Sequence, residues 1–323
     1  MKKALIASTA LVLSAGVAAA EVTISGYGRT GIIYYENQTD AAGNDLADTQ
    51  VVGRVRFNID GKTSTDAGVD FGARIRLQWD QGEATTERAS PGYLYATASG
   101  LTVYVGNVPT AYDSAGLLYA SELGAFDRSF GNTRGSFYAF SSKTYGAENN
   151  RVGVAAEYSV DALTVRMSYI DPDQSGLNED GIGENEELGF SVDYTWNDAL
   201  ELSAAAVMDG NGFDGNDQYF LGARYAVMPN ARVGLNWIDN GDVEGDGDAE
   251  RGKTFTLYGD YTLADGVTNF EAYVANNNAD DNDTDNAFGI GVNYDLGGAR
   301  LGASIHRDYA ENVTADFGVR FNF

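Results

Sequence analysis

The feature that most constrains the fold of this chain is an alternation of apolar and polar side chains with a period of two residues. It is clearest in TQVVGRVRFNIDG, residues 49–61, and in VDFGARIRLQWDQG, residues 69–82. Successive side chains of a β-strand point to opposite faces, so each segment predicts a strand with one apolar and one charged face. In the first segment Val51, Val55, Phe57 and Ile59 share one face, and Arg54, Arg56, Asn58 and Asp60 share the other.

The same pattern predicts sixteen strands whose connectors alternate in length. The predicted strands span residues 22–35, 50–61, 69–80, 92–98, 101–107, 151–158, 162–170, 187–196, 200–208, 218–227, 231–238, 253–262, 267–276, 286–294, 299–307 and 313–323. Long acidic or Asn-rich connectors, such as 36–49 and 108–150, alternate with short ones, such as 159–161 and 197–199. An even number of antiparallel strands with long loops at one end and tight turns at the other is the layout of an outer-membrane barrel.

The first twenty residues have the composition of a secretory signal peptide. Lys2 and Lys3 precede an apolar stretch, residues 4–17, and Ala18-Ala19-Ala20 fits the small-residue cleavage pattern. We therefore expect residues 1–20 to be removed on export and residues 21–323 to form one barrel domain.

Composition argues against several other classes of protein. The 21 Lys and Arg against 47 Asp and Glu give a net charge of −26, which opposes a nucleic-acid partner. The absence of cysteine rules out a disulfide framework, a thiolate metal site and a cysteine nucleophile. A Ser-His-Asp hydrolase would have to use His306, the one histidine. We expect no enzyme and interpret His306 as a residue that lines the pore.

A soluble β-sandwich would also alternate, but three features argue against it. The alternation continues without a change of composition that would mark a domain boundary. The chain finishes on VTADFGVRFNF, a strand that would be an exposed edge unless it closes against the first one. Aromatic residues also gather at strand ends on the apolar faces, as in the girdles of membrane barrels. They are Tyr34, Trp79, Tyr93, Tyr169, Tyr194, Trp196, Tyr219, Trp237 and Phe321.

Several segments resemble the general porins of Gram-negative bacteria, in particular the Rhodobacter type of alphaproteobacteria. They are the Ala-x-Ala export signal, the start EVTISGYGRTGIIYY, the long third loop, VNYDLGGARLGASI and the terminal aromatic of FGVRFNF. The resemblance implies an all-β fold, a 16-stranded antiparallel transmembrane β-barrel with a long third loop folded into the lumen. It also implies a homotrimer in contact with outer-membrane lipid and lipopolysaccharide, through which small hydrophilic solutes diffuse passively.

The resemblance further assigns the acidic side of a pore constriction. In the porins that this sequence resembles, acidic residues of the third loop line one side of the narrowest point. The corresponding loop here, residues 108–150, is the longest connector, and so long a loop is usually functional. The implied acidic residues are Glu122 and Asp127, together with Asp113.

The basic side of the constriction follows from strand register. A hairpin of 50–61 and 69–80 centred near residue 65 would place Arg54 opposite Arg76 and Arg56 opposite Arg74. Like charges directly across a ladder are destabilising, so the cluster makes sense where carboxylates across a narrow pore balance it. Arg29 on the first strand would extend the patch. The alternative is that these arginines are ordinary solvated groups paired with Asp60, Asp70 and Asp80.

Two acidic loops, residues 239–250 and 278–286, resemble calcium loops in composition. Neither has the spacing of glycine and glutamate that an EF-hand requires. We therefore expect no cofactor other than loosely bound Ca²⁺, which would bridge the loops or bind them to lipopolysaccharide. The weak candidates for its ligands are Asp242, Asp246, Asp281 and Asp283.

The sequence thus predicts a general diffusion porin that is weakly selective for cations because the chain is acidic. Two other functions remain open. One is a substrate-selective porin whose arginines bind a particular anion. The other is an exported adhesion or binding protein that forms no channel.

Overall fold

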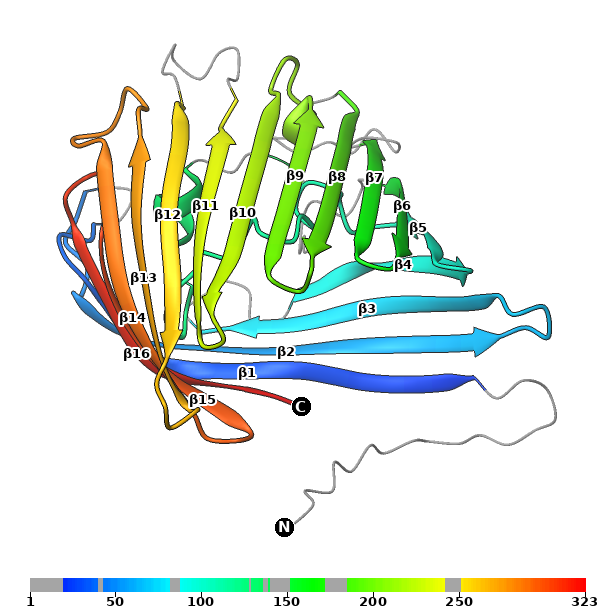
Figure 1. Cartoon of the computed structure of the whole chain (residues 1–323), viewed down its shortest axis with the longest axis horizontal. Coiled ribbons are helices and arrows are strands. Elements are labelled where there is room, and N and C mark those ends of the chain that lie inside the picture. Colours follow the sequence, from blue (N-terminus) through cyan, green and yellow to red (C-terminus); the bar gives the residue numbers. More distant parts are fainter. Residues whose placement is uncertain are drawn as a thin grey trace.

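The computed structural model of the chain describes residues 20–39, 43–81, 88–127, 129–135, 139, 152–171, 185–241 and 251–323. Residues 1–19, which hold nearly all of the expected signal peptide, lie outside this set. Within the described residues, sixteen antiparallel strands close into one barrel (Figure 1). Each strand pairs with its neighbours in sequence, and β1 also pairs with β16. The predicted fold class is therefore confirmed.

Every strand corresponds to a segment predicted from the alternation, and the largest difference at an end is that β4 begins at Arg88 instead of residue 92. The strands are β1 (Glu21–Tyr35), β2 (Thr49–Ser64), β3 (Asp70–Asp80), β4 (Arg88–Ala98), β5 (Leu101–Gly106), β6 (Val152–Val160), β7 (Leu163–Asp171), β8 (Glu187–Trp196), β9 (Leu200–Met208), β10 (Gln218–Met228), β11 (Ala231–Asp239), β12 (Lys253–Thr262), β13 (Thr268–Asn277), β14 (Asn286–Asp295), β15 (Ala299–Arg307) and β16 (Val313–Asn322).

Large apolar side chains cover the outer face of the barrel. Val51 on β2, Ile24 on β1 and Leu94 on β4 are 71%, 62% and 64% exposed. Water would disfavour so extensive an apolar surface, whereas the hydrocarbon core of a bilayer accommodates it. The closed ladder also leaves no unpaired strand edge, which a membrane-spanning sheet requires. The outer face is therefore suited to lipid.

Aromatic residues at the strand ends lie mostly on this outer face. Trp196, Tyr219 and Tyr34 are 56%, 43% and 40% exposed. The expectation for Tyr93 was wrong, because β4 directs Leu94 outward and Tyr93 therefore points into the lumen. There the ring of Tyr93 packs edge-on against Tyr104, with 5.6 Å between centroids.

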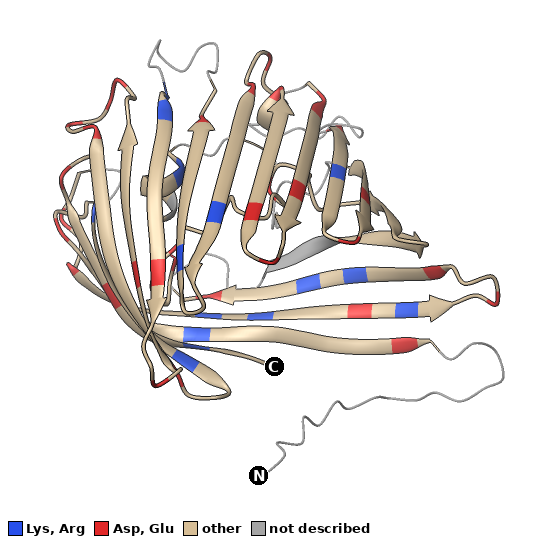
Figure 2. Ribbon diagram, viewed as in Figure 1, with Lys and Arg blue, Asp and Glu red and all other residues tan. Residues whose placement is uncertain are grey.

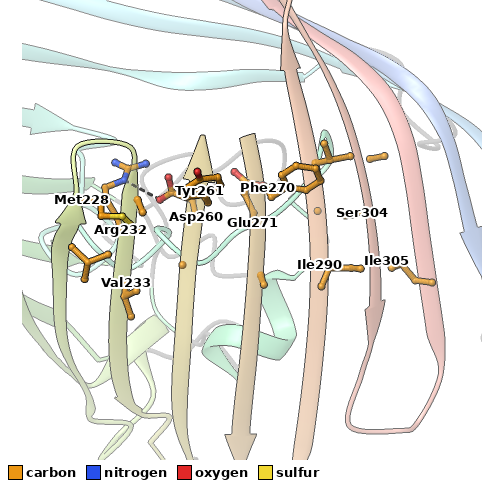
Figure 3. A pocket seen from close by; sticks show the side chains of 17 residues that line it. Met228, Arg232, Val233, Asp260, Tyr261, Phe270, Glu271, Ile290, Ser304 and Ile305 are labelled. Atoms are coloured by element: carbon orange, nitrogen blue, oxygen red, sulfur yellow. Dashed lines mark hydrogen bonds and ion pairs between the residues drawn. The ribbon is translucent and has the colours of Figure 1, made fainter. Parts of the chain in front are cut away.

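An apolar hollow of about 800 Å³ lies on the barrel wall over β10 to β15 (Figure 3). The wall is thin there because Gly259 of β12 pairs directly with Ala272 of β13. Arg232 and Asp260, joined by an ion pair of 2.9 Å in the same view, alternate with Val233 and Gly259 and so belong to the inner face. The hollow is part of the lipid-facing surface and lies apart from the pore.

The short turn between β12 and β13 is held by one carboxylate. Asp265 accepts hydrogen bonds from the backbone N–H of Val267 at 3.0 Å and of Thr268 at 2.9 Å, and from the Thr268 hydroxyl at 2.7 Å. These three bonds hold the pKa of Asp265 below its ordinary value. Gly266, at φ 73°, has the left-handed conformation that the turn requires.

The described parts of the connectors contain two short helical segments. They are α1 (Phe130–Arg134), in the loop after β5, and η1 (Gly210–Gly212), between β9 and β10. Among the described residues, no helix is long and apolar enough to cross a membrane. Figure 1 shows α1 inside the ring of strands, so the loop after β5 is the segment that occupies the lumen.

Candidate pore constriction

The loop that follows β5 runs along the inside of the barrel from residue 107 to residue 135. Its apolar side chains pack in clusters with inward-facing residues of the wall, three of which trace its path. Leu117 and Leu118 pack near Phe220 and Ile238, Leu123 packs near Tyr258 and Tyr273, and Phe126 packs near Ile33. The clusters progress from β10 and β11 through β12 and β13 to β1. The loop therefore follows the inner wall of the barrel, as the resemblance to porins implies.

Polar side chains of the wall hold the loop backbone at several points. The N–H of Ala111 donates to Ser168 of β7 and the N–H of Gly116 to Asp193 of β8, both at 2.9 Å. Asn236 of β11 donates to the carbonyl of Leu117 at 3.0 Å, and Thr256 of β12 donates to the carbonyl of Thr133 at 2.8 Å. Buried backbone groups need such partners, so these bonds fix the path of the loop.

Two tyrosines show how dry the interface between loop and wall is. Burial raises the pKa of Tyr112, which is 1% exposed, and that of Tyr119. The guanidinium carbon of Arg134 lies 4.2 Å from the centroid of the Tyr119 ring. Arg134 is also 1% exposed, and its Nη2 lies 3.9 Å from Oε1 of Glu122. The loop thus has its own charge pair, in which Arg134 is buried and Glu122 partly exposed.

The hairpin of β2 and β3 has a different register from the predicted one. Its turn is centred on residue 67, since the N–H of Thr65 bonds to the carbonyl of Val69 at 2.9 Å. The facing pairs are Arg54 with Asp80, Arg56 with Gln78, Arg76 with Asn58 and Arg74 with Asp60. The predicted pairs of Arg54 with Arg76 and of Arg56 with Arg74 were wrong. Opposite charges stabilise a ladder, and the observed register places carboxylates across from Arg54 and Arg74.

The alternative pairing of these arginines with aspartates is correct in part. Arg74 Nε lies 2.6 Å from Asp60, and Arg54 pairs with Asp80, whereas Asp70 pairs with Lys62 at 2.6 Å. Arg76 donates to Asn58 at 2.9 Å, and Arg56 donates to Gln78 at 2.7 Å. The inward direction predicted for the four arginines agrees with these contacts. Figure 2 shows the basic residues side by side on β1, β2 and β3.

An arginine row crosses four adjacent strands where the barrel closes. We use this name for Arg300 of β15, Arg320 of β16, Arg29 of β1 and Arg54 of β2, each directly opposite the next. Asp295 of β14 and Asp80 of β3 stand opposite the two ends of the row. The sequence argument found Arg29 and Arg54 but missed Arg300 and Arg320. Both have the inward phase of their strands, and closure of the last strand on the first was the signal that could have found them.

The three acidic candidates of the loop lie in different surroundings. Asp127 Oδ2 lies 3.3 Å from Arg29 and 3.3 Å from Arg320, so it contacts the middle of the arginine row instead of facing it across a gap. Glu122 lies beside Arg134, with 16% of its side chain exposed. Asp113 is 7% exposed and accepts a hydrogen bond from the Tyr119 hydroxyl.

Inward glycines make room for the tip of the loop. A Cβ atom on Gly318 of β16 would lie 2.6 Å from Cε2 of Phe126, and one on Gly302 of β15 would lie 2.9 Å from the nitrogen of Ala125. Arg300 donates to the carbonyl of Gly124 at 3.1 Å. The tip therefore packs directly on the closing strands, next to the arginine row.

The space left in the lumen is uneven. Between loop residues 120–123 and the wall of β10 to β13, the cavity measures only about 50 Å³. A larger hollow of about 880 Å³ opens beside the short turns, lined by Arg232, Glu271, Asn293, Arg300 and Arg320 among others. The loop thus leaves little space against β10 to β13 at residues 120–123, and charged residues line the larger hollow beside the turns.

His306 lies on the inner face of β15 and is 2% exposed. Its Nε2 is 2.6 Å from Oγ of Ser304, which in turn donates to Asp316. A catalytic triad needs the aspartate on the histidine and a free serine oxygen aimed at substrate. Here the aspartate contacts the serine instead, and loop residues cover the group.

The candidate calcium ligands are only partly described. Asp242 and Asp246 lie outside the described residues. Asp281 and Asp283 lie in the connector between β13 and β14, and the described part of the chain contains no group of three or more His, Asp or Glu that could hold a metal ion.

A closed barrel with an apolar outer face, a charged lumen and a loop packed inside defines a transmembrane pore. A sequence profile of the Gram-negative porin family matches residues 7–314. The chain is 41% identical over 307 residues to a porin of Fuscovulum blasticum and 26% identical over 338 residues to a porin of Rhodobacter capsulatus. Each comparison covers 94% of this chain and 100% of the relative.

Solved structures agree with the sequence relatives. Substituted forms of the Rhodopseudomonas blastica porin superpose with a TM-score of 0.81 at 38% identity, covering 94% of this chain and 100% of theirs. The chain therefore belongs to the Gram-negative porin family. A β-barrel of this family implies a place in the outer membrane.

Proposed function

We propose that this chain is a general diffusion porin in which the loop after β5 and the arginine row together form the constriction. The observation that carries the proposal is the contact of Asp127 with Arg29 and Arg320 at 3.3 Å, since it joins the loop to the closing strands. Arg54, Arg56, Arg74 and Arg76 form the rest of the basic side, and Glu122 and Asp113 the rest of the acidic side.

The transport mechanism follows from the size of electrostatic interactions in water. Two unit charges about 8 Å apart interact by about 0.5 kcal/mol in water and by several times more where the local dielectric is lower. Several charged side chains along the pore therefore orient a dipolar solute by about 1 kcal/mol. An apolar solute gains nothing and must displace ordered water. Such a pore filters solutes without binding them tightly.

Weak cation selectivity is the second part of the proposal. The net charge of −26 becomes −28 when Lys2 and Lys3 leave with the signal peptide, and it raises the local concentration of cations near the mouths of the channel. The arginine row opposes this preference inside the pore, which is why we expect the selectivity to be weak.

Export and assembly complete the proposal. Residues 1–20 act as a cleaved signal peptide, and the mature chain forms a homotrimer surrounded by lipid and lipopolysaccharide. The acidic loops, including Asp281 and Asp283, bind Ca²⁺ loosely, so chelation lowers the thermal stability of the trimer without closing the pores.

Planar-bilayer recording of detergent-extracted protein tests the proposal. We expect ohmic conductance in groups of three equal steps and a reversal potential with modest cation preference under a salt gradient. Replacing Glu122→Gln and Asp127→Asn together shifts the reversal potential toward anions. Folded protein that gives no steps contradicts the channel, and an unchanged reversal potential in the double variant removes these two residues from the constriction.

A substrate-selective porin is the second candidate function. The observation in its favour is that the 880 Å³ hollow is lined by Arg232, Arg300 and Arg320, which offers several guanidinium groups to one anion. Saturable block of chloride conductance by a dicarboxylate would support this function. Conductance that rises linearly with salt and is unaffected by the dicarboxylate supports general diffusion.

A further inference from the structure

A line of hydrogen bonds enters the barrel wall from helix α1 of the constriction loop. The Asn132 amide donates to the hydroxyl of Tyr273 on β13 at 2.8 Å. That hydroxyl lies 3.3 Å from Nδ1 of His306 on β15. The rings of Tyr273 and His306 are stacked, 5.8 Å between centroids, and both are 2% exposed. The first half of the line thus joins the loop to a buried imidazole.

The line returns to the loop through β16. Nε2 of His306 lies 2.6 Å from Oγ of Ser304, and Ser304 donates to Oδ2 of Asp316. Oδ1 of Asp316 accepts the backbone N–H of Ala125 at 3.3 Å. His306 therefore stands between two anchors of the same loop, one on α1 and one at the tip.

The positions of the protons follow from what each group can donate. Ser304 donates its single proton to Asp316, so His306 Nε2 must donate to Ser304. Nδ1 of the neutral ring then accepts the proton of Tyr273, whose oxygen accepts from Asn132. The geometry assigns the Nε2–H tautomer of neutral His306, the one form in which each of these bonds has one donor and one acceptor.

We propose that neutral His306 is a positioning residue for the constriction loop and that its protonation loosens the Asn132 end of that loop. The inference rests on the proposed pore function and adds regulation to it. In the imidazolium form Nδ1 also carries a proton and turns it toward the Tyr273 oxygen, which already accepts from Asn132. The two donors then compete for one oxygen, and the buried Tyr273 proton loses its acceptor. The bond from Nε2 to Ser304 survives, since both forms donate there. Protonation therefore acts on one anchor and spares the other.

The groups around His306 decide how protonation is balanced. Asp316 lies one hydroxyl away from the buried imidazole, on the far side of Ser304. The titratable groups on the elements packed around His306 are Tyr273 and Glu271 of β13, Asp316 of β16, and Asp308 and Tyr309 of the β15–β16 connection. On β14 the facing residue is Gly289, where a Cβ atom would lie 2.5 Å from His306 Nδ1. An ordinary histidine titrates near pH 6.5, so the experiment scans conductance across that value.

Bilayer conductance measured from pH 8 to pH 5 tests the inference with three variants. The unmodified protein is expected to show one titration step, His306→Gln to lose it, and Tyr273→Phe to show the acidic conductance already at pH 8. Tyr309→Phe is the matched control. It also removes one hydroxyl bond to the loop, from Tyr309 to the Asn132 carbonyl at 2.6 Å, but it leaves the His306 line intact and should keep the step.

Other results would overturn the inference. A step that persists in His306→Gln, or that disappears equally in Tyr309→Phe and Tyr273→Phe, assigns the pH response elsewhere. Conductance without any step contradicts this inference alone, whereas no conductance at any pH contradicts the proposed function. Nitrogen-15 NMR of the single histidine gives a readout that needs no channel. The Nε2–H tautomer is expected at pH 8, and the Nδ1–H tautomer there would refute the assignment.

Discussion

The arginine row and the wall that anchors the loop handle charge in opposite ways. On the wall, Arg166 of β7 lies 2.6 Å from Glu157, Arg224 of β10 lies 2.6 Å from Glu201, and Arg232 of β11 lies 2.9 Å from Asp260. Each cation there has a carboxylate on a neighbouring strand. In the row, by contrast, four arginines face one another. Only the outer two have a carboxylate across the ladder, Asp295 and Asp80, and the carboxylate between the middle two comes from the loop.

This difference gives the two regions different roles: the wall supports the loop, and the arginine row filters solutes. Local pairs cancel charge over a short distance, so the wall can pack against a dry loop without leaving a strong field. Directly opposed arginines cost free energy within the ladder, and Asp127 offsets part of that cost by binding Arg29 and Arg320. The tip of the loop and the row therefore depend on each other, whereas the wall is balanced by its own strands.

The largest effect should come from a cavity on the wall side. Leu118 is fully buried in the cluster with Phe220 and Ile238. Leu118→Ala is expected to destabilise the folded protein by about 2–5 kcal/mol, because a close-packed cluster relaxes only partly. The temperature at which the folded band disappears in gel electrophoresis should fall, and channel noise should rise as the loop loosens.

The matched control for that variant lies on the outer face. Leu94 is 64% exposed toward lipid, so Leu94→Ala opens no internal cavity and should shift the transition much less. Equal shifts for the two variants would mean that the loop is not packed on the wall as described.

The strands and the loop inside them differ in how far the sequence predicts them. The strands could be predicted from the local period of two residues. The predicted bounds agree with the observed ones because the polarity of each side chain indicates the face on which it lies. The path of the loop depends on partners far along the chain, since Ala111, Gly116 and Leu117 are bound by residues 57, 77 and 119 positions away. No local pattern marks such pairs.

The register of the β2–β3 hairpin was harder to predict than the strands and easier than the path of the loop. The β2–β3 turn was placed two residues too early, and the choice of facing residues changed with it. The rule that opposite charges prefer to face each other would have selected Arg54 with Asp80 and Arg74 with Asp60 from the sequence alone. Arg300 and Arg320 needed one further step, the closure of β16 on β1, which the edge-strand argument had already predicted.

A smaller effect should appear at alkaline pH in the dry interface. Burial raises the pKa of Tyr112 and of Tyr119 above the ordinary value of about 10. Their folded-state protons stabilise the protein fully below pH 10, and this contribution is lost as the pH rises further, because the unfolded chain ionises first. At pH 11 each tyrosine that stays protonated costs about 1.4 kcal/mol of stability.

Difference titration checks the alkaline prediction. Absorbance at 295 nm is recorded as the pH rises, for the unmodified protein and for Tyr119→Phe. The variant lacks the phenolate signal of Tyr119, and we expect this loss in the late step that accompanies unfolding. If the signal lost in the variant belongs instead to the early step near pH 10, water reaches Tyr119 and the interface between loop and wall is not dry.

The smallest expected effect is a change of ion selectivity when one arginine charge is removed. It tests the difference between the arginine row and the wall most directly. Arg320→Gln removes one charge from the row, and Arg224→Gln removes one from a locally paired site on the wall. A charge at the constriction acts on passing ions by about 0.5 kcal/mol, so Arg320→Gln should raise the cation-to-anion permeability ratio by about twofold. Arg224→Gln should change it less, because Glu201 already cancels much of the Arg224 field. Reversal potentials under one salt gradient measure both variants. If the two shifts are equal, the register of the arginines has no role in selectivity and net charge alone sets it; if Arg320→Gln shifts further, selectivity depends on where the barrel closes.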